Sequence, residues 1–370
     1  MSISMKRLEK VMNRIAPLRY AYDWDNSGAT IVTHDQVNRI LLCLDVTEDV
    51  LEEAVEGRFD TVISHHPLIF KPLKKLVPED PIGALVLKAV VNGINLYAAH
   101  TSFDCAPGGI NDLLADALML RNKRLFLKEK AERYKKIVVF APFDDENAVK
   151  QAMFDAGAGE QGEYSSVSFS TVGTGEFLPT MFARPAIGRG GVMEQVEELR
   201  IECFCPAEIA DRVAAAARSA HSYEEPVIDV YDLDYPRNDV GLGVVGELVA
   251  PMSAESFAKY VKKRLGAASV RYSGNSGRIS SVACVGGSGG EFFQEAKKMG
   301  IDALVTGEAK YNHFIDAKAS GIVLVEAGHY DTECAFMGAM MKHLQKAFND
   351  VQCNISMSVS LNGGRPYDIE

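Results

Sequence analysis

The sequence of 370 residues lacks any hydrophobic run of the roughly 18 residues that a membrane-spanning helix needs. Five charged side chains interrupt residues 1–18, so this segment also lacks the apolar stretch of a secretory signal. These two absences argue against the membrane and secreted classes. We therefore expect a soluble protein with no membrane partner.

Paired cysteines are also missing. The sequence holds seven cysteines, an odd number, and its closest two, Cys203 and Cys205, do not form a C-x-x-C pair. This pattern predicts neither a disulfide framework nor a zinc ribbon. Several cysteines, such as Cys43 and Cys284, lie in apolar runs, where a thiol commonly serves as a small core residue. The cysteine usage predicts a protein of the reducing cytoplasm.

Basic charge is in deficit as well. The 39 lysines and arginines face 50 aspartates and glutamates, which gives a net charge of -11 and a pI of about 5.3. A nucleic acid would be repelled on average, so we do not expect one as a partner. The remaining composition, 47% hydrophobic and 24% charged, is that of a globular protein, and the length predicts two or three domains.

Apolar runs and helix-like segments alternate over the first third of the chain. The ranges 39–46, 61–64 and 94–99 are rich in apolar and β-branched residues, which predicts buried strands. Helices are predicted at 47–56, which begins with a capping threonine, and at 81–92. This strand–helix–strand order predicts a parallel sheet with both faces covered.

The alternation of strands and helices stops near residue 121 and returns after residue 241. The basic, polar range 121–136 predicts a solvated boundary, and an α+β module of about 100 residues follows it. Its predicted elements are strands 136–141, 196–205 and 227–232, helices 146–156 and 207–220, and a Gly-, Ser- and Thr-rich stretch at 157–175. Beyond the module we predict strands at 280–285, 303–306 and 322–326 and helices at 291–299, 312–319 and 331–348.

The predicted fold class is therefore α/β, a split core of two βα-rich halves interrupted by an inserted α+β domain. The predicted boundaries are 1–125 for the first half of the core, 130–238 for the insert and 239–370 for the second half. Such an interruption is tolerated because the ends of an inserted domain commonly lie close together.

Two glycine-rich segments resemble phosphate-binding loops. Residues 241–246 match G-x-G-x-x-G, but no predicted strand leads into them and a strand follows them, so we interpret the match as chance. Residues 286–290 lie between a predicted strand and a predicted helix. Their amides could face an anion, or the glycines could serve a tight turn, and the sequence leaves both readings open.

Ligand-type side chains follow three of the predicted strands; they are His65, His66, His100, Asp104, His329 and Glu333. A lone histidine is more commonly structural than functional. However, the carboxyl ends of parallel strands meet at one edge of a sheet, where α/β proteins bind their ligands. The i, i+4 spacing of His329 and Glu333 also puts both on one face of a helix. The placement favours a common site.

The donor types at this site predict metal ions. Imidazole nitrogens and carboxylate oxygens, without thiolates, suit zinc, iron, manganese or cobalt. Three histidines and two carboxylates exceed the needs of one catalytic zinc and fit two ions that share a bridging carboxylate. We therefore predict two divalent metal ions per subunit, with zinc favoured and iron or manganese as alternatives.

Together these residues resemble the signature of a known family, the GTP cyclohydrolase 1 type 2 homologs, also called the NGG-one-interacting-factor-three-like proteins. The similarity extends over nearly the whole chain and includes segments 24–28, 44–47 and 306–310. In the insert, segments 160–164, 173–177 and 221–226 resemble the PII/CutA-like module of the longer bacterial members.

The resemblance implies a dinuclear metal centre with five ligands and His100 beside them; the ligands are His65, His66, Asp104, His329 and Glu333. It also implies a toroidal homohexamer in which the inserted modules make trimer contacts. The sequence departs from the family pattern at Ser27 and around His313, and we interpret His221 of the insert as structural.

Two functional classes stay open. One is a metal-dependent hydrolase of a small molecule, in which His100 would act as general acid or base beside metal-activated water. The family label implies opening of the purine ring of GTP, yet no phosphate-binding lysine motif or purine pocket is legible in the sequence, so the substrate is unassigned. The other is a non-catalytic metal-binding regulator or scaffold hexamer whose insert senses a small effector.

Overall fold

The computed structural model describes residues 2–162, 164–274, 277–350, 353 and 355–368. Glu163, in one of the segments that resemble the inserted module, lies outside the described residues. Contacts divide the chain into two compact units, unit 1 (Met1–Lys130 and Val240–Glu370) and unit 2 (Ala131–Asp239). These bounds lie close to the predicted ones, 1–125, 130–238 and 239–370, while folding of the core without the insert stays a prediction. No helix in the described part of the chain is both long and apolar enough to cross a membrane.

Unit 1 contains two large sheets, a small strand pair and most of the helices. Its strands are β1 (Ile3–Ser4), β2 (Gly28–Ile31), β3 (Gln36–Val37), β4 (Arg39–Cys43), β5 (Thr61–Ser64), β6 (Asn95–Ala98), β11 (Arg271–Ser273), β12 (Ile279–Ser288), β13 (Ala303–Glu308), β14 (Val323–Glu326) and β15 (Ser356–Val359). Its helices are α1 (Met5–Ile15), α2 (Glu48–Glu56), α3 (Pro81–Val91), α4 (Thr101–Asp104), α5 (Ile110–Ala117), α8 (Ala254–Leu265), α9 (Phe293–Lys298), α10 (Tyr311–Ser320), α11 (His329–Glu333) and α12 (Ala335–Asp350). Short 3-10 turns stand at Leu18–Tyr20 and Gly290–Phe292.

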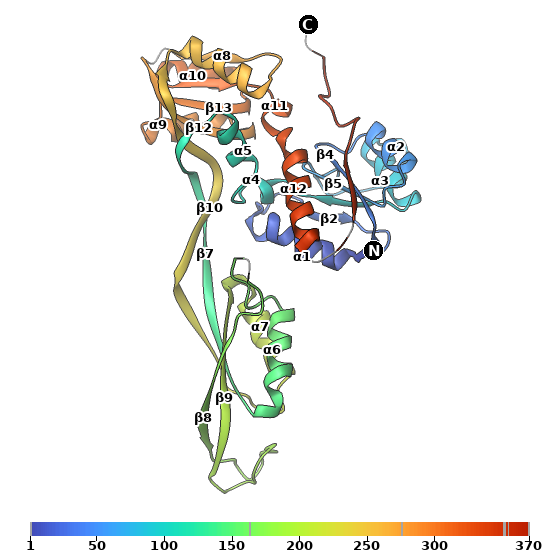
Figure 1. Ribbon diagram of the computed structural model, residues 1–370, viewed down its shortest axis with the longest axis vertical. Helices are drawn as coiled ribbons and strands as arrows, with labels where there is room; N and C mark the ends of the chain where they lie inside the picture. Colours follow the sequence, from blue (N-terminus) through green and yellow to red (C-terminus); the bar gives the residue numbers. More distant parts are fainter. Residues whose placement is uncertain (1, 163, 275–276, 351–352, 354, 369–370) are drawn as a thin grey trace. The chain divides into compact units, whose positions relative to one another are not determined.

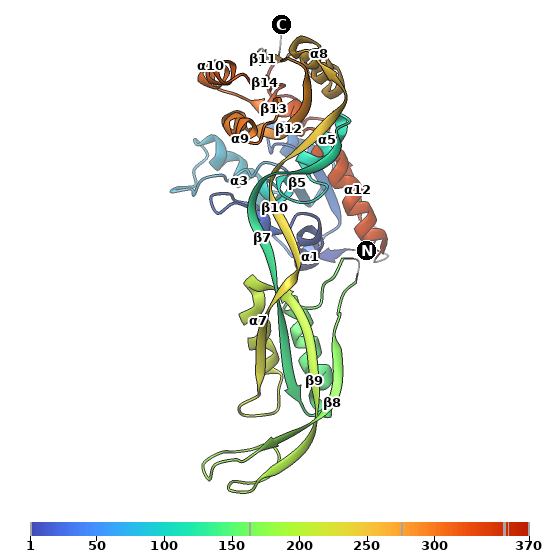
Figure 2. The same cartoon turned by 90° about the vertical axis from the view of Figure 1, so that its left-hand side faces the viewer.

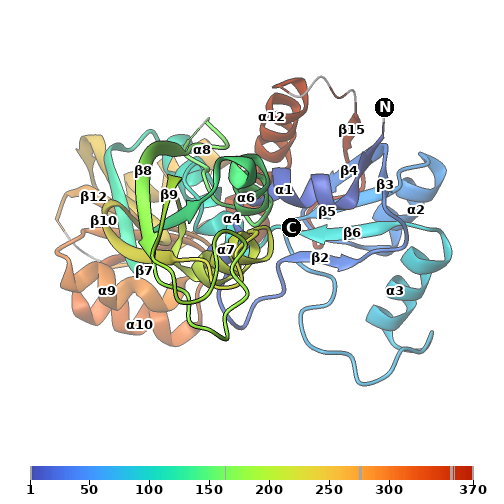
Figure 3. The same ribbon diagram turned by 90° about the horizontal axis from the view of Figure 1, so that it is seen from below.

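The first sheet has the strand order β15–β4–β5–β6–β2. Strands β15, β4, β5 and β6 are parallel neighbours, and β2 pairs antiparallel with β6 at the edge. Alternate side chains point to opposite faces, so Ile40 and Leu42 pack with α1 and α12, while Leu41 and Cys43 pack with α2 and α3. Figure 3 shows these helices on the two sides of the sheet. The predicted covered parallel sheet is thus present.

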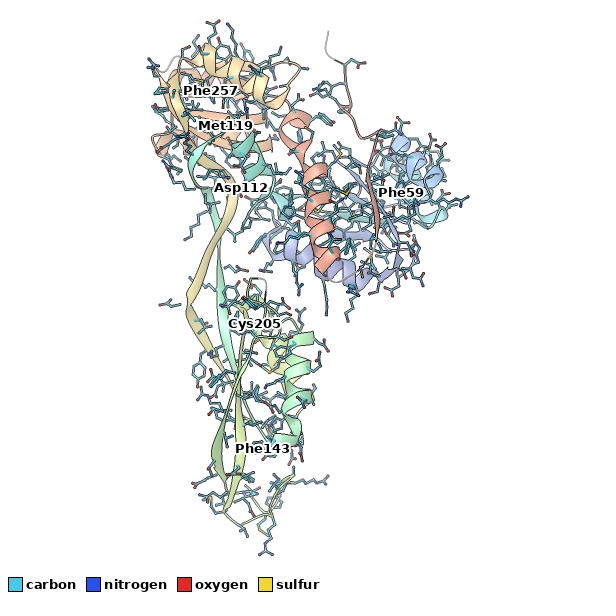
Figure 4. The ribbon with its side chains drawn as sticks, viewed as in Figure 1. Phe59, Asp112, Met119, Phe143, Cys205 and Phe257 are labelled. Atoms are coloured by element: carbon cyan, nitrogen blue, oxygen red, sulfur yellow. The ribbon has the colours of Figure 1, made fainter. Side chains whose placement is uncertain are left out.

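The second sheet of unit 1 has the order β11–β14–β13–β12–β10, where β10 spans Ile228–Met252. The three central strands are parallel, and β11 and β10 flank them in antiparallel pairing. Helices α5 and α8 pack on one face and α9 and α10 on the other (Figure 2). Figure 4 labels Phe257 in this core and Phe59 in the core of the first sheet.

Unit 2 is an α+β unit built on the antiparallel strands β7 (Arg121–Ala141), β9 (Glu194–Pro206) and β8 (Phe169–Phe177). Helices α6 (Glu146–Asp155) and α7 (Ala210–Ser219) follow 3-10 turns at Phe143–Asp145 and Ala207–Ile209. Both helices pack on one face of the strands, and Cys205, labelled in Figure 4, belongs to that core (Figure 1). The chain enters the unit along β7 and leaves it along β10.

Two local predictions need correction and one is extended. The predicted boundary range 121–136 contains the division between the two units, after Lys130, and it belongs to β7, where strand pairing satisfies its backbone. Residues 241–246 lie inside β10, so a strand does lead into them; they open no helix, in keeping with a chance motif. The predicted helix 331–348 is divided into α11 and α12 at Cys334.

Candidate metal centre

Strand β5 ends at Ser64, and the next two residues continue its pairing before the chain turns. The N–H of His65 donates to the carbonyl of Cys43 (3.3 Å), and the N–H of His66 donates to the carbonyl of Leu44 (3.0 Å). The Ser64 hydroxyl donates to the carbonyl of His66 (2.7 Å). These bonds fix both histidines at the carboxyl edge of the first sheet.

His100 and Asp104 stand at the two ends of the short helix α4, directly after β6. The Nδ1 atom of His100 lies 2.7 Å from Asp25 Oδ1. Asp25 also accepts hydrogen bonds from the N–H and the hydroxyl of Thr101, at 3.1 and 2.6 Å. The Asp25 carboxylate therefore holds the imidazole and the first turn of α4 in one arrangement.

His329 and Glu333 are the first and last residues of α11, so their side chains share one face of that helix. Gly328 precedes the helix with φ 94°, a backbone conformation that residues with a Cβ rarely adopt. Its N–H donates to the carbonyl of Gly307 (3.1 Å) at the end of β13. This turn directs α11 across the carboxyl edge of the second sheet.

Donor atoms from these three places converge within unit 1. His66 Nε2 and His329 Nε2 each lie 3.0 Å from Glu333 Oε2 and 3.3 Å from each other. His65 Nε2 lies 3.5 Å from Asp104 Oδ1 and 3.8 Å from Glu333 Oε1. The ligand atoms of His65, His66 and Glu333 all lie within 4.8 Å of one another. The structure thus brings the five predicted ligands together, although their role as ligands stays a prediction.

His100 lies beside this cluster. Its ring centroid is 5.4 Å from that of His65 and 5.5 Å from that of His66. An aromatic wall continues outward from His100, formed by Trp24, which is 59% exposed, and Phe70, which is 45% exposed. Tyr22 stacks on Trp24 with a centroid separation of 5.4 Å.

The cluster has the donor chemistry that a metal ion requires. His65 Nε2, Asp104 Oδ1 and Glu333 Oε2 are buried and have no hydrogen-bond partner of acceptable geometry. Such atoms are rare because each costs roughly 1–3 kcal/mol when left unpaired. One or two divalent cations would satisfy all three, and imidazole with carboxylate is a donor set that zinc, iron and manganese accept. The residues present therefore fit a metal ion.

The other ring nitrogen of each predicted histidine ligand is anchored by an oxygen acceptor. Nδ1 lies 2.8 Å from the Ala99 carbonyl in His65, 2.8 Å from Asp45 Oδ1 in His66, and 3.0 Å from Glu308 Oε1 in His329. An oxygen acceptor at Nδ1 favours a proton there and leaves the Nε2 lone pair for a metal. All three imidazoles are thus oriented for coordination through Nε2.

Burial and mutual charge set the protonation of the metal-free centre. Burial raises the pKa of Asp104. Burial would also raise the pKa of Glu333, but its contacts with the three imidazoles hold it well below the usual range. Burial lowers the pKa of His66, yet Asp45 and Glu333 outweigh this effect and raise it to about 10. His66 therefore keeps a proton near neutral pH in the metal-free protein, and a metal ion would displace that proton.

Sequence reasoning missed the carboxylates that orient the histidines. Asp25, Asp45 and Glu308 entered only as parts of segments that resemble the family. For Asp45 and Glu308 a signal was available, because each stands at or just after the carboxyl end of a parallel strand, β4 or β13. Asp25 lies in a loop and offers no such signal.

In the glycine-rich segment 286–290, three backbone amides donate to side chains of the protein and are not available to an anion. The N–H of Gly286 donates to Asn111 Oδ1, that of Gly287 to Thr332 Oγ1 and that of Gly289 to Thr306 Oγ1. Gly287 has φ 59°, and a Cβ there would overlap the Glu333 carboxylate. Glycine is needed because the end of β12 passes directly beside the metal centre.

The two positions at which the sequence departs from the family pattern, Ser27 and His313, have local structural roles. Ser27 donates its hydroxyl to Asp25 (2.6 Å), so it belongs to the support of His100. His313 accepts a hydrogen bond from the Lys310 N–H at the start of α10 (3.3 Å). Neither departure from the family pattern disturbs the cluster of predicted ligands.

The fold and this site define a mixed α/β protein with a His/Glu cluster able to hold metal. The chain belongs to the Duf34/NIF3 (NGG1p interacting factor 3) family, whose sequence model matches residues 3–362. It is 35% identical over 368 residues to a protein of Bacillus subtilis named GTP cyclohydrolase 1 type 2 homolog, covering 99% of this chain and 98% of that one. The resemblance found in the sequence is therefore confirmed.

Further relatives agree with this assignment. A Halalkalibacterium halodurans protein of the same name is 36% identical over 343 residues, 92% of each chain. The crystal structure of a Bacillus cereus protein related to NIF3 is similar with a TM-score of 0.79, at 36% identity and 99% coverage of both chains. A Staphylococcus aureus structure is similar with a TM-score of 0.73 at 30% identity, covering 100% of this chain and 99% of that one.

Proposed function

We propose that the protein is a dinuclear metal-dependent hydrolase that acts on a small molecule. The observation that carries the proposal is the set of three buried, unpaired donor atoms, on His65, Asp104 and Glu333, beside two further imidazoles. Each predicted histidine ligand is already fixed through Nδ1, which is an arrangement typical of metal sites.

The five predicted ligands would together coordinate two metal ions. His65, His66, His329 and Asp104 would each supply one donor, and the Glu333 carboxylate, which faces all three imidazoles, would contribute to holding both ions. When bound, such ions lower the pKa of water to near neutrality and polarise a carbonyl, amidine or phosphoryl group. Zinc is the metal we propose first, with iron or manganese as alternatives.

We assign His100 the role of moving a proton without itself being a ligand. Its Nδ1 proton is held by Asp25, whose pKa is lowered because hydrogen bonds from His100, Ser27 and Thr101 outweigh its burial. The ionised carboxylate fixes the imidazole tautomer, so Nε2 is free to accept or return a proton. Asp25 is therefore a positioning residue for the proposed acid–base group.

The surroundings of the centre support a substrate with a planar, apolar part. Trp24 and Phe70 extend the site outward from His100 and remain largely exposed, so a flat ring could stack on them. The name shared by the relatives suggests opening of the GTP purine ring, and we retain that reaction only as one member of the test panel.

The test pairs metal analysis with a panel of nucleotide, cyclic amide and phosphoester substrates on wild type and two variants. We expect about two divalent ions per chain in wild type, loss of metal and activity in Asp104→Ala, and retained metal with lost activity in His100→Asn. Asp49→Ala, an exposed position on α2, is the control. A fully loaded protein that turns over no substrate would favour the non-catalytic metal-binding regulator, and absence of metal binding would refute both.

We also propose that the chain assembles as a cytoplasmic homohexamer in which the insert, which we assign to the PII/CutA-like type, makes trimer contacts. The support is the family membership together with the α+β composition of unit 2. A hexamer would have a mass near six times 40.3 kDa by light scattering of the purified protein. A monomer at micromolar concentration would refute this assembly.

A further inference from the structure

The two faces of the sheet in unit 2 differ in what covers them. One face packs against α6 and α7 through residues such as Val139 and Ile201. The opposite face carries a cleft of about 630 Å³, lined by β7, β8, β9 and the segments after β8 and α7. This volume lies within the range of small-molecule sites in proteins.

Glycines of β8 make the floor of this cleft flat. Gly173 and Gly175 lie on the same face, two residues apart, and both line the cleft. A Cβ at Gly173 would meet no atom within 4 Å, so this position opens directly into the cleft. A Cβ at Gly175 would overlap the carboxylate of Glu198, so the absence of a side chain there makes room for that group.

Glu198 is the buried carboxylate that lines the cleft. It is paired with Gly173 across the strands and is only 8% exposed. Within the described part of the chain it forms no ion pair: the nearby Arg200 binds Glu202 instead, at 2.7 Å. A buried carboxylate without a cation is costly unless a partner neutralises it.

Aromatic side chains form the walls around this carboxylate. Phe140 and Phe177 line the cleft, and Tyr223 packs against Phe177 with ring centroids 6.3 Å apart. The Tyr223 hydroxyl is buried and lies next to the Glu198 carboxylate, with no other hydrogen-bond partner among the described residues. Burial and the adjacent Glu198 raise the pKa of Tyr223, so it stays a neutral donor or acceptor at physiological pH.

His221 holds Tyr223 in place over the cleft. Its Nε2 lies 2.8 Å from the carbonyl of Phe140, and its Nδ1 accepts the N–H of Tyr223 at 2.9 Å. The imidazole therefore joins β7 to the segment after α7, which agrees with the structural role expected of His221. The wall of the cleft is fixed without any ligand.

We propose that this cleft binds a small organic cation, an amine or guanidinium compound with an apolar or aromatic body. The cationic group would pair with Glu198, the Tyr223 hydroxyl would supply a further polar contact, and the body would pack on Phe140 and Phe177. The lining as a whole carries four carboxylates and one guanidinium, which favours a cation and opposes an anion. A metal ion is not the occupant we choose, because the described residues of unit 2 offer no cluster of metal-ligating side chains.

Calorimetric titration of the full-length protein tests this proposal with phenethylamine and agmatine as probes. We expect saturable binding of at least one amine and much weaker binding of 2-phenylethanol and 3-phenylpropionate, which lack the positive charge. Glu198→Gln should weaken amine binding about 30-fold or more, because it removes a desolvated charge partner. Gly173→Val should abolish binding by filling the cleft, while its Cβ meets no neighbour.

Two controls separate this cleft from the metal centre and from general charge effects. Glu208→Gln, an exposed position of the same unit outside the cleft, should leave amine binding unchanged. Asp104→Ala should also leave it unchanged, since it alters only the proposed metal centre. The proposal is overturned if neither amine binds, if the neutral alcohol binds as well as phenethylamine, or if Glu198→Gln binds the amines like wild type.

Discussion

At the scale of single residues, the candidate metal centre includes carboxylates that are not predicted ligands themselves but contact its histidines directly. Asp45 holds His66 through Nδ1, and Asp25 holds His100 in the same way. Such partners fix the tautomer and the direction of the ring, so their removal changes metal affinity while most of the packing is kept.

The first prediction concerns Asp45→Asn. The amide keeps the shape of the side chain but loses the charge that orients and polarises His66. We expect metal affinity to fall by roughly 10- to 100-fold with little change in fold. Competition with a chromophoric chelator measures the affinity, and Asp49→Asn on the exposed face of α2 serves as the control. Equal affinities for the two variants would contradict the role assigned to Asp45.

The second prediction concerns pH. In the metal-free protein, Asp45 and Glu333 outweigh burial and raise the pKa of His66 from 6.5 to about 10. Its contribution to stability is therefore complete below pH 6.5 and is lost as the pH rises toward 10. Metal binding requires the neutral imidazole, so metal affinity should rise across the same interval.

Thermal melts of the chelated protein measure the loss of stability with rising pH, and metal titrations measure the gain in metal affinity. Both are made between about pH 6 and 9, the interval in which His66 titrates. Asp45→Asn should flatten both curves, because it removes one of the groups that raise the pKa of His66. A metal affinity that does not change with pH would contradict the assignment.

At the scale of secondary-structure elements, the site lies where strands end and short helices begin. Strand β5 leads into His65 and His66, and β6 leads into His100 and Asp104 at the two ends of α4. Helix α11 carries His329 and Glu333. Strand β12 ends beside this same point, and a Cβ at its Gly287 would overlap the Glu333 carboxylate.

The third prediction follows from that approach. Gly287→Ala would place a Cβ on the Glu333 carboxylate and would also strain a backbone with φ 59°. We expect a loss of about 1–3 kcal/mol in unfolding free energy from the strain and a loss of metal affinity from the displaced carboxylate.

Gly266→Ala is the matched control, because Gly266 ends α8 with φ 65° and has open space around its Cβ position. It should show the strain without any change in metal affinity. Denaturant titration of the metal-free proteins and metal titration of the folded ones separate the two effects. Equal metal affinities in both variants would show that the approach to Glu333 is unimportant.

At the scale of the whole molecule, the candidate metal centre is formed by residues on either side of the insert. His65 and Asp104 precede unit 2 in the sequence, and His329 and Glu333 follow it, yet all four belong to unit 1. The centre therefore needs both halves of the core, while no predicted ligand comes from the insert.

The fourth prediction is that unit 1 folds without the insert. Replacing residues 130–238 by a short Gly/Ser linker should leave a cooperative thermal transition and the same metal content per chain as wild type, because each unit has its own hydrophobic core. Circular dichroism and metal analysis make the comparison. Aggregation together with loss of metal would show that the core depends on the insert for folding.

The sequence by itself determined the local elements and the identity of the candidate ligands. Strand β5 falls at the predicted range 61–64, and Thr47 caps α2 through the Val50 N–H, because apolar runs and caps act between near neighbours in the chain. The histidines and carboxylates at strand ends were recognisable for the same reason, since the edge of a parallel sheet is set by the strand pattern.

Only the tertiary structure decided what depends on distant partners. The polar range 121–136 became part of β7 because strand pairing satisfied its backbone, and Asp25 and Asp45 became positioning residues because folding brought them to His100 and His66. The same holds for the cleft of unit 2, where Glu198 faces a floor of glycines across β8 and β9. Such relations join residues far apart in sequence, and local propensity and periodicity carry no information about which distant groups meet.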